Sequence, residues 1–448
     1  MRCCSPFTER RVSRRGSVLV VAIWAVAVTT VLAASIQLFA FRQTMVSYDS
    51  LDRMRARWAA RSGVEASIAM MALHTTEPVP DDARAILIDL EQVSAGDLLN
   101  ASFDIQYHRD GFNINGPRDA HSRLHIGREG FPLFELLEDI SFDQAAAIQD
   151  WIDEDDEPGL GGAEADYYRA TSGVQPRNGP LHSILELELI AGVWNDYVRN
   201  EDQNHNGRLD PNENDGDLTA PNDIADDILD MGWSGMLTVY SVDFGATDSG
   251  LPRIHLRRAE PGDLENRCGV SAEQAEILVA FGRHEENSLL DLITTPISQI
   301  NTDGTVANAP VNEELEELTD DQIISLLHET RVLPLFDRRP GRVNVNTAST
   351  YLIEDMCEAR GLPIEIAEEI IYLRSSQPQG IVSELEFRDM RGVDADMLPI
   401  LLDMFGTRSN VFVIASRGRA GQNGPESEII AVVDRSTVPV RILEYREQ

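Results

Sequence analysis

The clearest chemical signal in this sequence is a calcium-binding loop, Asp202-Gln-Asn-His-Asn-Gly-Arg-Leu-Asp-Pro-Asn-Glu213. It fits the pattern D-x-[DN]-x-[DN]-G-x5-E at every fixed position. Calcium takes six to eight oxygen ligands, and this spacing distributes them around a tight turn that Gly207 permits. The expected ligands are the side chains of Asp202, Asn204, Asn206, Asp210 (directly or through water) and Glu213 (bidentate), and the backbone carbonyl of Arg208.

The alternative for this segment is a solvated loop rich in Asp and Asn that binds nothing. Asp215 and Asp217 follow closely enough to add ligands from outside the loop. The sequence holds no second loop of the pattern to pair with it, and Pro221 soon follows. We therefore expect a stabilising calcium site and not a switch.

A second acidic segment, Trp151-Ile-Asp-Glu-Asp-Asp-Glu-Pro158, is followed by Gly161-Gly-Ala-Glu164. So many acids near the C-terminus of a predicted helix oppose the helix dipole. They must be solvated or share a cation. The further candidate cation ligands are Asp153, Asp155, Asp156 and Glu164.

The sequence lacks the common catalytic motifs: it has no Gly-x-Ser-x-Gly elbow, no His-Glu-x-x-His, no phosphate loop and no dinucleotide fingerprint. Two carboxylates suffice for glycoside hydrolysis, but a chain with 75 acids offers such a pair anywhere. We expect no enzyme. An anchored hydrolase, the alternative, would need a cleft lined by functional acids.

Charge and cysteine content limit the partners and the scaffold. The net charge of −37 over 448 residues repels nucleic acid and anionic lipid and favours cations or basic partners. A chain of this length should form two to four units. Cys3 and Cys4 lie near the N-terminus, which leaves Cys268 and Cys357 in the remainder of the chain. These two can form one disulfide if their Cα atoms come close enough.

The segment Ser17–Phe41 carries no charged side chain. As a helix it is about 37 Å long, enough to cross a hydrocarbon core of about 30 Å. The basic residues before it place the N-terminus in the cytoplasm, which makes the rest of the chain external. A cleaved signal peptide ending near Ala33-Ala34-Ser35 is the alternative. The basic residues are Arg2, Arg10, Arg11, Arg14 and Arg15, against Glu9.

From Arg42 to about Leu73 the helix should continue with one apolar face, until Pro78 and Pro80 end it. That face could pack on the chain's own globular part, or contact neighbouring helices of a filament as well.

An internal repeat is visible in Gly111-Phe-Asn-Ile-Asn115, Gly341-Arg-Val-Asn-Val-Asn346 and, degraded, Pro252-Arg-Ile-His-Leu256. Helices are predicted after the copies, over 142–152, 271–281 and 364–373. The asparagines are expected to cap these helices. The repeat therefore predicts several similar helical units.

Strands are predicted over 102–107, 235–243, 411–416, 428–434 and 440–445, and a linker over 301–310. The last three strands are short and separated by turn residues, which predicts an antiparallel meander. With the strand near residue 103 they should form a small sheet that packs on the N-terminal helix.

The basic leader ending in Gly16 and followed at once by an apolar helix resembles type IV prepilins and pseudopilins. In that family a cytoplasmic prepilin peptidase cuts after the glycine, here between Gly16 and Ser17. Two positions depart from the pattern: Ser17 stands where an apolar residue is usual, and Val21 stands where most members have glutamate.

The Trp151–Pro158 string, the Gly161–Glu164 string and Tyr167-Tyr168 resemble the minor pseudopilin K family of type II secretion systems, in which the missing glutamate is typical. The resemblance implies a protein of the inner membrane that caps a periplasmic pseudopilus with other minor pseudopilins and helps to start its assembly.

The third repeat also resembles the helix-hairpin-helix fold of DNA-binding proteins, through Val343–Ala348, Gly361-Leu-Pro363 and Gly392-Val-Asp394. A membrane-tethered DNA-uptake protein is therefore the alternative function. The acids around the motif would repel DNA, so we expect no nucleic-acid partner. They are Glu365, Glu368, Glu369, Glu384, Glu386 and Asp389.

These observations predict an α+β fold, in which a long membrane-spanning helix packs on a small antiparallel pseudopilin sheet that carries large inserted helical units, helix-hairpin-helix or SAM-like in type. The expected organisation is a cleaved leader (1–16), the membrane helix (17–41), its amphipathic extension (42–75), first strands (76–115), an inserted helical domain with the calcium loop (116–234), a second repeat and linker (235–335), a helix-hairpin-helix unit (336–405) and C-terminal strands (406–448).

Overall fold

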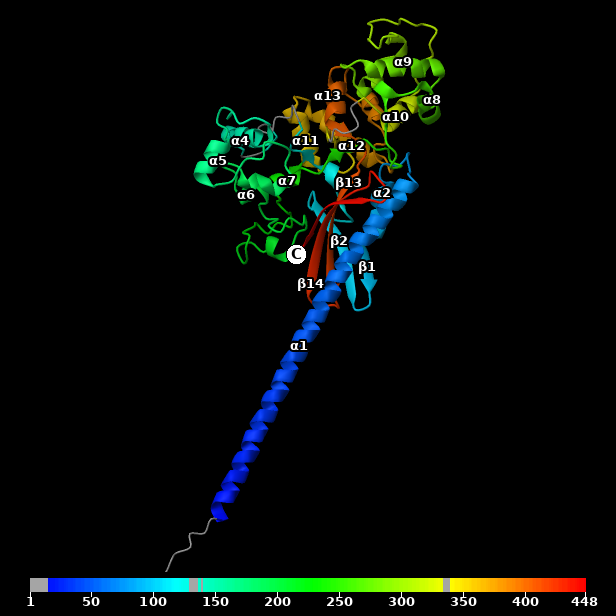
Figure 1. Cartoon of the computed structure of the whole chain (residues 1–448). Coiled ribbons are helices and arrows are strands. Elements are labelled where there is room, and N and C mark those ends of the chain that lie inside the picture. The colour runs from blue at the N-terminus through cyan, green and yellow to red at the C-terminus, as the bar shows by residue number, and fades with distance from the viewer. Residues whose placement is uncertain (1–14, 129–135, 138–139, 333–338) are drawn as a thin grey trace, which may run out of the picture.

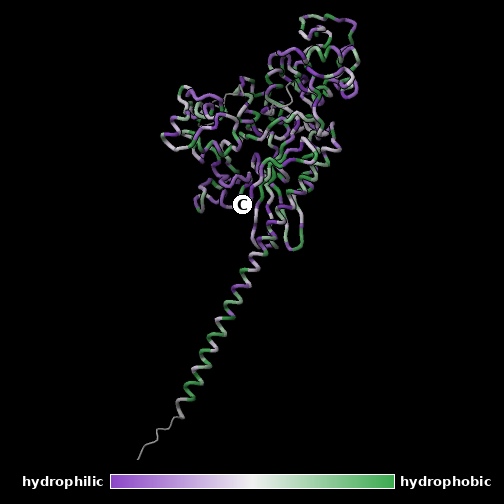
Figure 2. The backbone as a smooth tube through the Cα atoms, viewed as in Figure 1, coloured by the Kyte–Doolittle hydropathy of each residue, from purple (hydrophilic) through white to green (hydrophobic). Residues whose placement is uncertain are grey.

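A computed structural model describes residues 15–128, 136–137, 140–332 and 339–448. The leader residues 1–14, with their arginines, Cys3 and Cys4, lie outside the described residues. Helix α1 (Arg15–Thr76) forms a long rod, and the rest of the described chain is gathered at its C-terminal end (Figure 1). The first part of the rod is exposed, and Figure 2 shows many hydrophobic residues, coloured green, along it. Between 18 and 76 this helix is long and apolar enough to cross a membrane.

One antiparallel sheet packs against the second half of α1. Its strand order is β1-β2-β13-β14-β15, with β3 paired to β2 and β4 to β13. The strands are β1 (Ala95–Leu98), β2 (Ala101–Arg109), β3 (Phe112–Asn115), β4 (Arg118–Asp119), β13 (Val411–Ala420), β14 (Glu426–Asp434) and β15 (Arg441–Glu447). The α+β prediction and the pairing of the first strands with the C-terminal meander are confirmed.

The helix and the sheet approach closely because small residues line their contact. Ala56, Ala60 and Gly63 of α1 face β13, where Gly418 provides the room. Beyond these, Val64 and Met71 pack on Ile105, Phe412 and Ile414 in one buried core. A short helix α2 (Ala85–Gln92), which the sequence did not reveal, adds Leu90 to this core.

Between β4 and β13 the chain forms three helical units, each bracketed by two short parallel strands. The bracketing pairs are β5 (Leu124–His125) with β6 (Leu237–Thr238), β8 (Ile254–His255) with β9 (Thr330–Arg331), and β11 (Val343–Asn344) with β12 (Phe405–Gly406). The predicted internal repeat is therefore a repeat of closed units. Strands β7 (Val242–Asp243) and β10 (Arg339–Pro340) form a further antiparallel pair.

Three helices of the units, α4, α9 and α12, lie at the predicted positions, and the others were not predicted. The first unit has α4 (Phe142–Ile152), α5 (Ala165–Thr171), η2 (Ile184–Leu189), α6 (Asn195–Val198), η3 (Pro211–Glu213) and α7 (Trp233–Met236), and η1 (Ala120–Ser122) precedes it. The second has η4 (Leu256–Arg258), α8 (Pro261–Cys268), α9 (Ala272–Arg283), η5 (Leu289–Ile293), η6 (Ile297–Gln299) and α10 (Asp320–Glu329). The third has α11 (Thr350–Ala359), α12 (Ile364–Ser376), η7 (Glu384–Asp389) and α13 (Met397–Met404).

Two local predictions were wrong. The asparagines do not cap the predicted helices: Ser141 caps α4 and Ser271 caps α9, each accepting a hydrogen bond from a first-turn backbone N–H, and α12 follows Pro363 without a side-chain cap. Asn346 instead bonds Ile381 and Thr407 across the third unit. The strand predicted over 235–243 is broken into the end of α7 and two short strands, because tertiary pairing with β5 and β10 overrides the alternation.

The two internal cysteines lie in different cores and are free thiols. Cys357 belongs to the core shared by the first and third units, and Cys268 to the separate core of the second unit. Burial raises the pKa of each thiol to about 12, with Glu329 adding to the effect at Cys268. The disulfide left open by the sequence does not form in this structure.

Both thiols should therefore resist alkylation in the folded chain. In a Cys3→Ser/Cys4→Ser background at pH 8, a thiol reagent should label neither residue until denaturant is added, and then should label both without reductant. Thiolate is the reactive form, and burial suppresses it. Rapid labelling of the native chain would contradict the buried positions, and a denatured chain that needs reductant before it reacts would reveal a disulfide.

Candidate functional site

The loop Asp202–Glu213 folds around its own side-chain oxygens. Asp202 accepts hydrogen bonds from the backbone N–H groups of Asn206 and Gly207, at 3.0 and 2.9 Å. The side-chain oxygen of Asn204 accepts from Asn206 N–H, and that of Asn206 from Arg208 N–H. Gly207 has a φ of +69°, in the region that favours glycine. These turns hold the oxygens toward the inside of the loop.

The second half of the loop returns its acids to the same interior. Asp210 accepts hydrogen bonds from the side-chain amides of Asn204 and Asn206, at 2.9 and 3.0 Å. Glu213 accepts from the backbone N–H of Asp210 at 2.9 Å. The side chains predicted as calcium ligands thus lie in one network.

The carboxylates of the loop are buried and carry unfavourable charge. Asp202 and Glu213 are each 1% exposed. Burial raises the pKa of Asp202 to about 6. Burial, together with the charges of Asp202 and Asp210, raises the pKa of Glu213 to about 8. Burial by itself would raise the pKa of Asp210, but Arg417 and the hydrogen bonds from Asn204 and Asn206 together lower it. A hard cation would relieve this repulsion, so the donor set fits calcium.

The loop rests on the sheet through contacts that the sequence did not reveal. Arg208 pairs with Asp104 of β2, and Arg417 of β13 pairs with Asp210. Asn206 donates to Glu428 of β14 at 2.9 Å, and Gly207 accepts from the backbone N–H of His108 at 2.7 Å. The loop therefore joins the first helical unit to the sheet.

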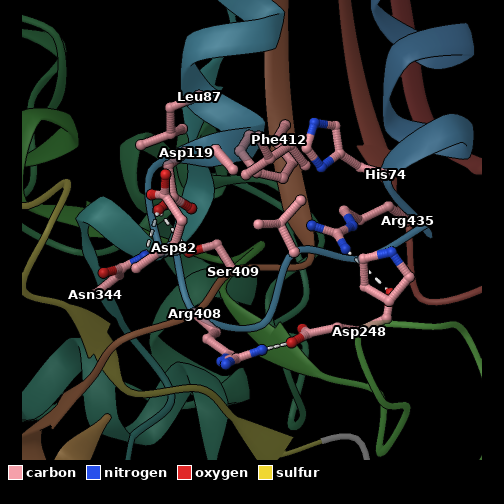
Figure 3. A pocket seen from close by; sticks show the side chains of 15 residues that line it. His74, Asp82, Leu87, Asp119, Asp248, Asn344, Arg408, Ser409, Phe412 and Arg435 are labelled. Atoms are coloured by element: carbon pink, nitrogen blue, oxygen red, sulfur yellow. Dashed lines mark hydrogen bonds and ion pairs between the residues drawn. The ribbon is translucent and has the colours of Figure 1, made fainter. Parts of the chain in front are cut away.

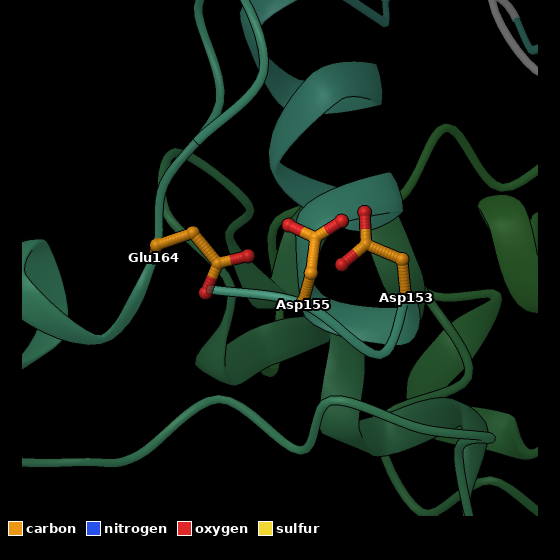
Figure 4. Close-up of side chains that lie close together, drawn as sticks. All are labelled: Asp153, Asp155 and Glu164. Atoms are coloured by element: carbon orange, nitrogen blue, oxygen red, sulfur yellow. The ribbon is translucent and has the colours of Figure 1, made fainter. Parts of the chain in front are cut away.

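A second candidate cation site lies in the first helical unit, between the end of α4 and the start of α5 (Figure 4). Oxygens of Asp153, Asp155 and Glu164 all lie within 4.8 Å of one another. Glu164 is 4% exposed, and neither of its oxygens has a hydrogen-bond partner among the described residues. Burial and then neighbouring carboxylates raise the pKa values of Asp153 and Glu164. This set also fits a hard cation.

The remaining candidate ligands, Asp156, Asp215 and Asp217, do not belong to either of these two sets. Asp156 accepts a hydrogen bond from Asn178 at 2.9 Å. Asp215 accepts from the hydroxyl of Thr219 at 2.6 Å. Asp217 is exposed, and the described residues show no contact that directs it toward the loop.

A small cavity lies where α1, α2 and the third unit meet the sheet (Figure 3). Its volume is about 50 Å³, room for a few water molecules but not for an organic substrate. Arg408 and Asp248 form an ion pair at its edge, and Asp119 accepts hydrogen bonds there from Ser409 and Asn344. Asp119 also accepts from Thr347 and thereby ties β4 to the third unit.

Comparison with known proteins gives a family match that covers part of the first helical unit and the strands before it. Residues 113–200 match the family model described as type II secretion system (T2SS), protein K. The chain carries a type II secretion protein K domain. The match contains both acidic strings, Trp151–Pro158 and Gly161–Glu164, on which the resemblance to this family rested.

Two further similarities extend beyond the protein K domain. The chain is 27% identical over 199 residues to "Type II secretion system protein K" of Klebsiella pneumoniae, a match that covers 40% of this chain and 58% of that protein. The chain thus matches less than two thirds of the length of this relative. A distant likeness, with 12% identity and a TM-score of 0.44, is to the crystal structure of the GspK-GspI-GspJ complex from the enterotoxigenic Escherichia coli type 2 secretion system; it covers 91% of this chain and 99% of that one.

Proposed function

We propose that this chain is a minor pseudopilin of a type II secretion system, and that it forms part of the pseudopilus tip with other minor pseudopilins. The observation that carries the proposal is the protein K domain at 113–200, inserted in a head whose sheet packs on one long apolar helix. In this role the tip complex initiates pseudopilus assembly and supports protein export across the outer membrane.

The anchor is the apolar first half of α1. We place it in the inner membrane as a single span, with the N-terminus in the cytoplasm and the head in the periplasm, because the arginines precede the apolar run. Prepilin peptidase is the processing enzyme, and it cuts between Gly16 and Ser17.

Calcium has a structural role in this proposal. The loop Asp202–Glu213 holds the ion where the first unit meets the sheet, and the chemistry it supplies is charge compensation for buried carboxylates. Asp202, Asn204, Asn206, Asp210 and Glu213 present side-chain oxygens, and Arg208 its carbonyl. The protein works by assembly and not by catalysis.

DNA uptake is disfavoured by the surface of the third unit. Glu365 and Glu368 of α12 are exposed next to the hairpin that would face phosphate. A polyanion would meet like charge there, without lysines to offset it.

One purification tests the proposal with two readouts. The chain, tagged at its C-terminus, is cross-linked mildly in cells that carry its secretion system and is purified from membranes. N-terminal sequencing should begin at Ser17, and the cross-linked products should contain other minor pseudopilins. A chain that retains Met1, or that begins near Ser35 and is free of the bilayer, would overturn the pseudopilin assignment; a chain that begins at Ser17 but has no pseudopilin partner would overturn the tip position.

A further inference from the structure

Two turns form the end of the head that faces the N-terminal, apolar half of α1 (Figure 1). One turn joins β1 to β2 through Leu99 and Asn100, and the other joins β13 to β14 through residues 421–425. Gly421 N–H donates a hydrogen bond to Asn100 at 2.9 Å, so the two turns form one surface. If α1 spans a bilayer, this surface is the part of the head nearest to it.

Two leucines are exposed on that surface. Leu98 is 44% exposed and Leu99 is 89% exposed. Tight turns normally carry Gly, Asn, Asp or Pro, and Asn100, with a φ of +58°, meets that need by itself. The turn therefore does not require a leucine at position 99. A Leu side chain in water lacks the stabilisation that burial would give it, so these residues suit an apolar neighbour outside the head.

The position of the turns along α1 identifies that neighbour. Gly418 of β13 packs between Ala56 and Ala60, and the strand runs toward the membrane from there. Three more residues of strand cover about 10 Å, which equals about seven residues of helix. The turns therefore lie beside α1 near Leu51.

The helix between Phe41 and that level has the composition of a membrane interface. After Arg42, residues 43–48 carry no charge, and Asp49 is the first acid of the helix. Met45, Val46 and Tyr48 are 56%, 64% and 61% exposed, and Tyr is typical of the headgroup level. An apolar run longer than the hydrocarbon core also favours tilt, which brings one side of the head closer to the lipid.

Charge is compensated at this end of a chain whose net charge is −37. Arg419 pairs with Glu426 at 2.6 Å across the base of one turn, and Arg53 pairs with Asp49 on the helix at 2.9 Å. Residues 421–425 are uncharged, and Asp97 is the one charged residue between Ala95 and Asn100. Apart from Asp97, the charges named here are paired, so this surface repels anionic lipid less than the acidic head as a whole does.

We propose that Leu98 and Leu99 insert into the interface of the lipid bilayer while α1 is anchored in it. The contact is a second, weak attachment that holds the head in one orientation on the membrane before assembly, and it is lost when the subunit leaves the bilayer. This inference rests on the proposed membrane anchor.

The test places one exposed cysteine at a time on the full chain in nanodiscs, with the buried Cys268 and Cys357 left in place. In a Cys3→Ser/Cys4→Ser background, Leu99→Cys, Leu160→Cys and Leu32→Cys each carry an environment-sensitive fluorophore, and the lipid is phosphatidylcholine with or without a nitroxide-labelled fraction. Leu160 is 86% exposed in the first helical unit and is the matched exposed leucine. Leu32 lies in the apolar half of α1.

Nitroxide lipid should quench the Leu99 probe to at least about half the extent seen at Leu32, and the Leu160 probe hardly at all, because interfacial burial reaches about 5–10 Å into the headgroup boundary. A probe at Gln422 should also be quenched, and Leu98→Asp/Leu99→Asp should remove that quenching. Quenching at Leu99 no greater than at Leu160, with Leu32 quenched, would overturn the inference and leave the anchor intact. Absence of quenching at Leu32 would overturn the anchor, and the inference with it.

Discussion

Gly418→Ala should lower the free energy of unfolding of the head by about 3 kcal/mol, in the range for overpacking in a tight core. A Cβ at residue 418 would overlap the carbonyl oxygen of Ala56 and the amide nitrogen of Ala60. Both atoms belong to the backbone of α1, so no side chain can rotate away to make room. The helix must move off the sheet, and the core around Val64 and Ile414 would open with it.

Gly262→Ala is the matched control for this change. It makes the same substitution in α8, and a Cβ there would meet nothing within 4 Å. Alanine favours a helix over glycine by up to about 1 kcal/mol, so this variant should be neutral or slightly more stable. Urea unfolding of the full chain in detergent, followed by circular dichroism, measures the stability of both variants. If Gly418→Ala unfolds at the same urea concentration as the parent, the close contact of α1 with β13 is contradicted.

Calcium should raise the melting temperature of the chain by roughly 5 °C over its value in chelator. A ligand at about 100 times its dissociation constant stabilises the folded state by about 2.7 kcal/mol, and sites of the extracellular kind bind calcium with constants of about 10⁻⁴ M or weaker. About 10 mM calcium is therefore a suitable concentration. The gain arises because an ion bound in the folded loop offsets the repulsion among Asp202, Asp210 and Glu213.

Asp202→Ala with Glu213→Ala should abolish this rise. The comparison is the difference between calcium and chelator within each variant, because loss of the Asp202 turn bonds also lowers stability directly. Asp166→Ala with Glu285→Ala is the control: it removes two charges whose side chains are 95% and 89% exposed, and the rise should persist.

The second acidic set gives a distinct result in the same assay. If the ion is held by Asp153, Asp155 and Glu164 alone, the rise survives the loop variant and is lost in Asp153→Asn/Glu164→Gln. If both sets hold ions, each double variant loses part of the rise in melting temperature. Equal melting of the unchanged chain with calcium and with chelator would remove calcium from the proposal.

The elements that the sequence predicted well are those whose signal is local. The uncharged run in α1, the amphipathic helices α4 and α9, the helix α12 and the alternating C-terminal strands can each be recognised within a short window of residues. The short strands β5, β6, β8 and β9 could not be read in the same way. Each of these strands has only two residues, which is too short to show a periodic pattern, and its partner strand is distant in the chain.

The two candidate cation sites also differ in whether their signal lies in one segment of the sequence. The spacing of the loop Asp202–Glu213 is visible in one segment, and in the structure its side chains form hydrogen-bonded turns. The grouping of Glu164 with Asp153 and Asp155 depends on how the chain returns after α4, so the sequence offered only a list of acids. Arg417 and Glu428, which meet the loop from β13 and β14, gave no signal at all.

By itself, the sequence determined the apolar rod, the type and spacing of the loop oxygens and the acidic character of the head, because each is a property of neighbouring residues. Only the tertiary structure decided that the loop Asp202–Glu213 rests on the sheet, that Cys268 and Cys357 lie in separate cores, and that the β1–β2 turn, which carries Leu99, lies at the end of the head nearest the apolar half of α1. Those outcomes depend on contacts between segments hundreds of residues apart, whose pairing is selected by the packing of the whole core.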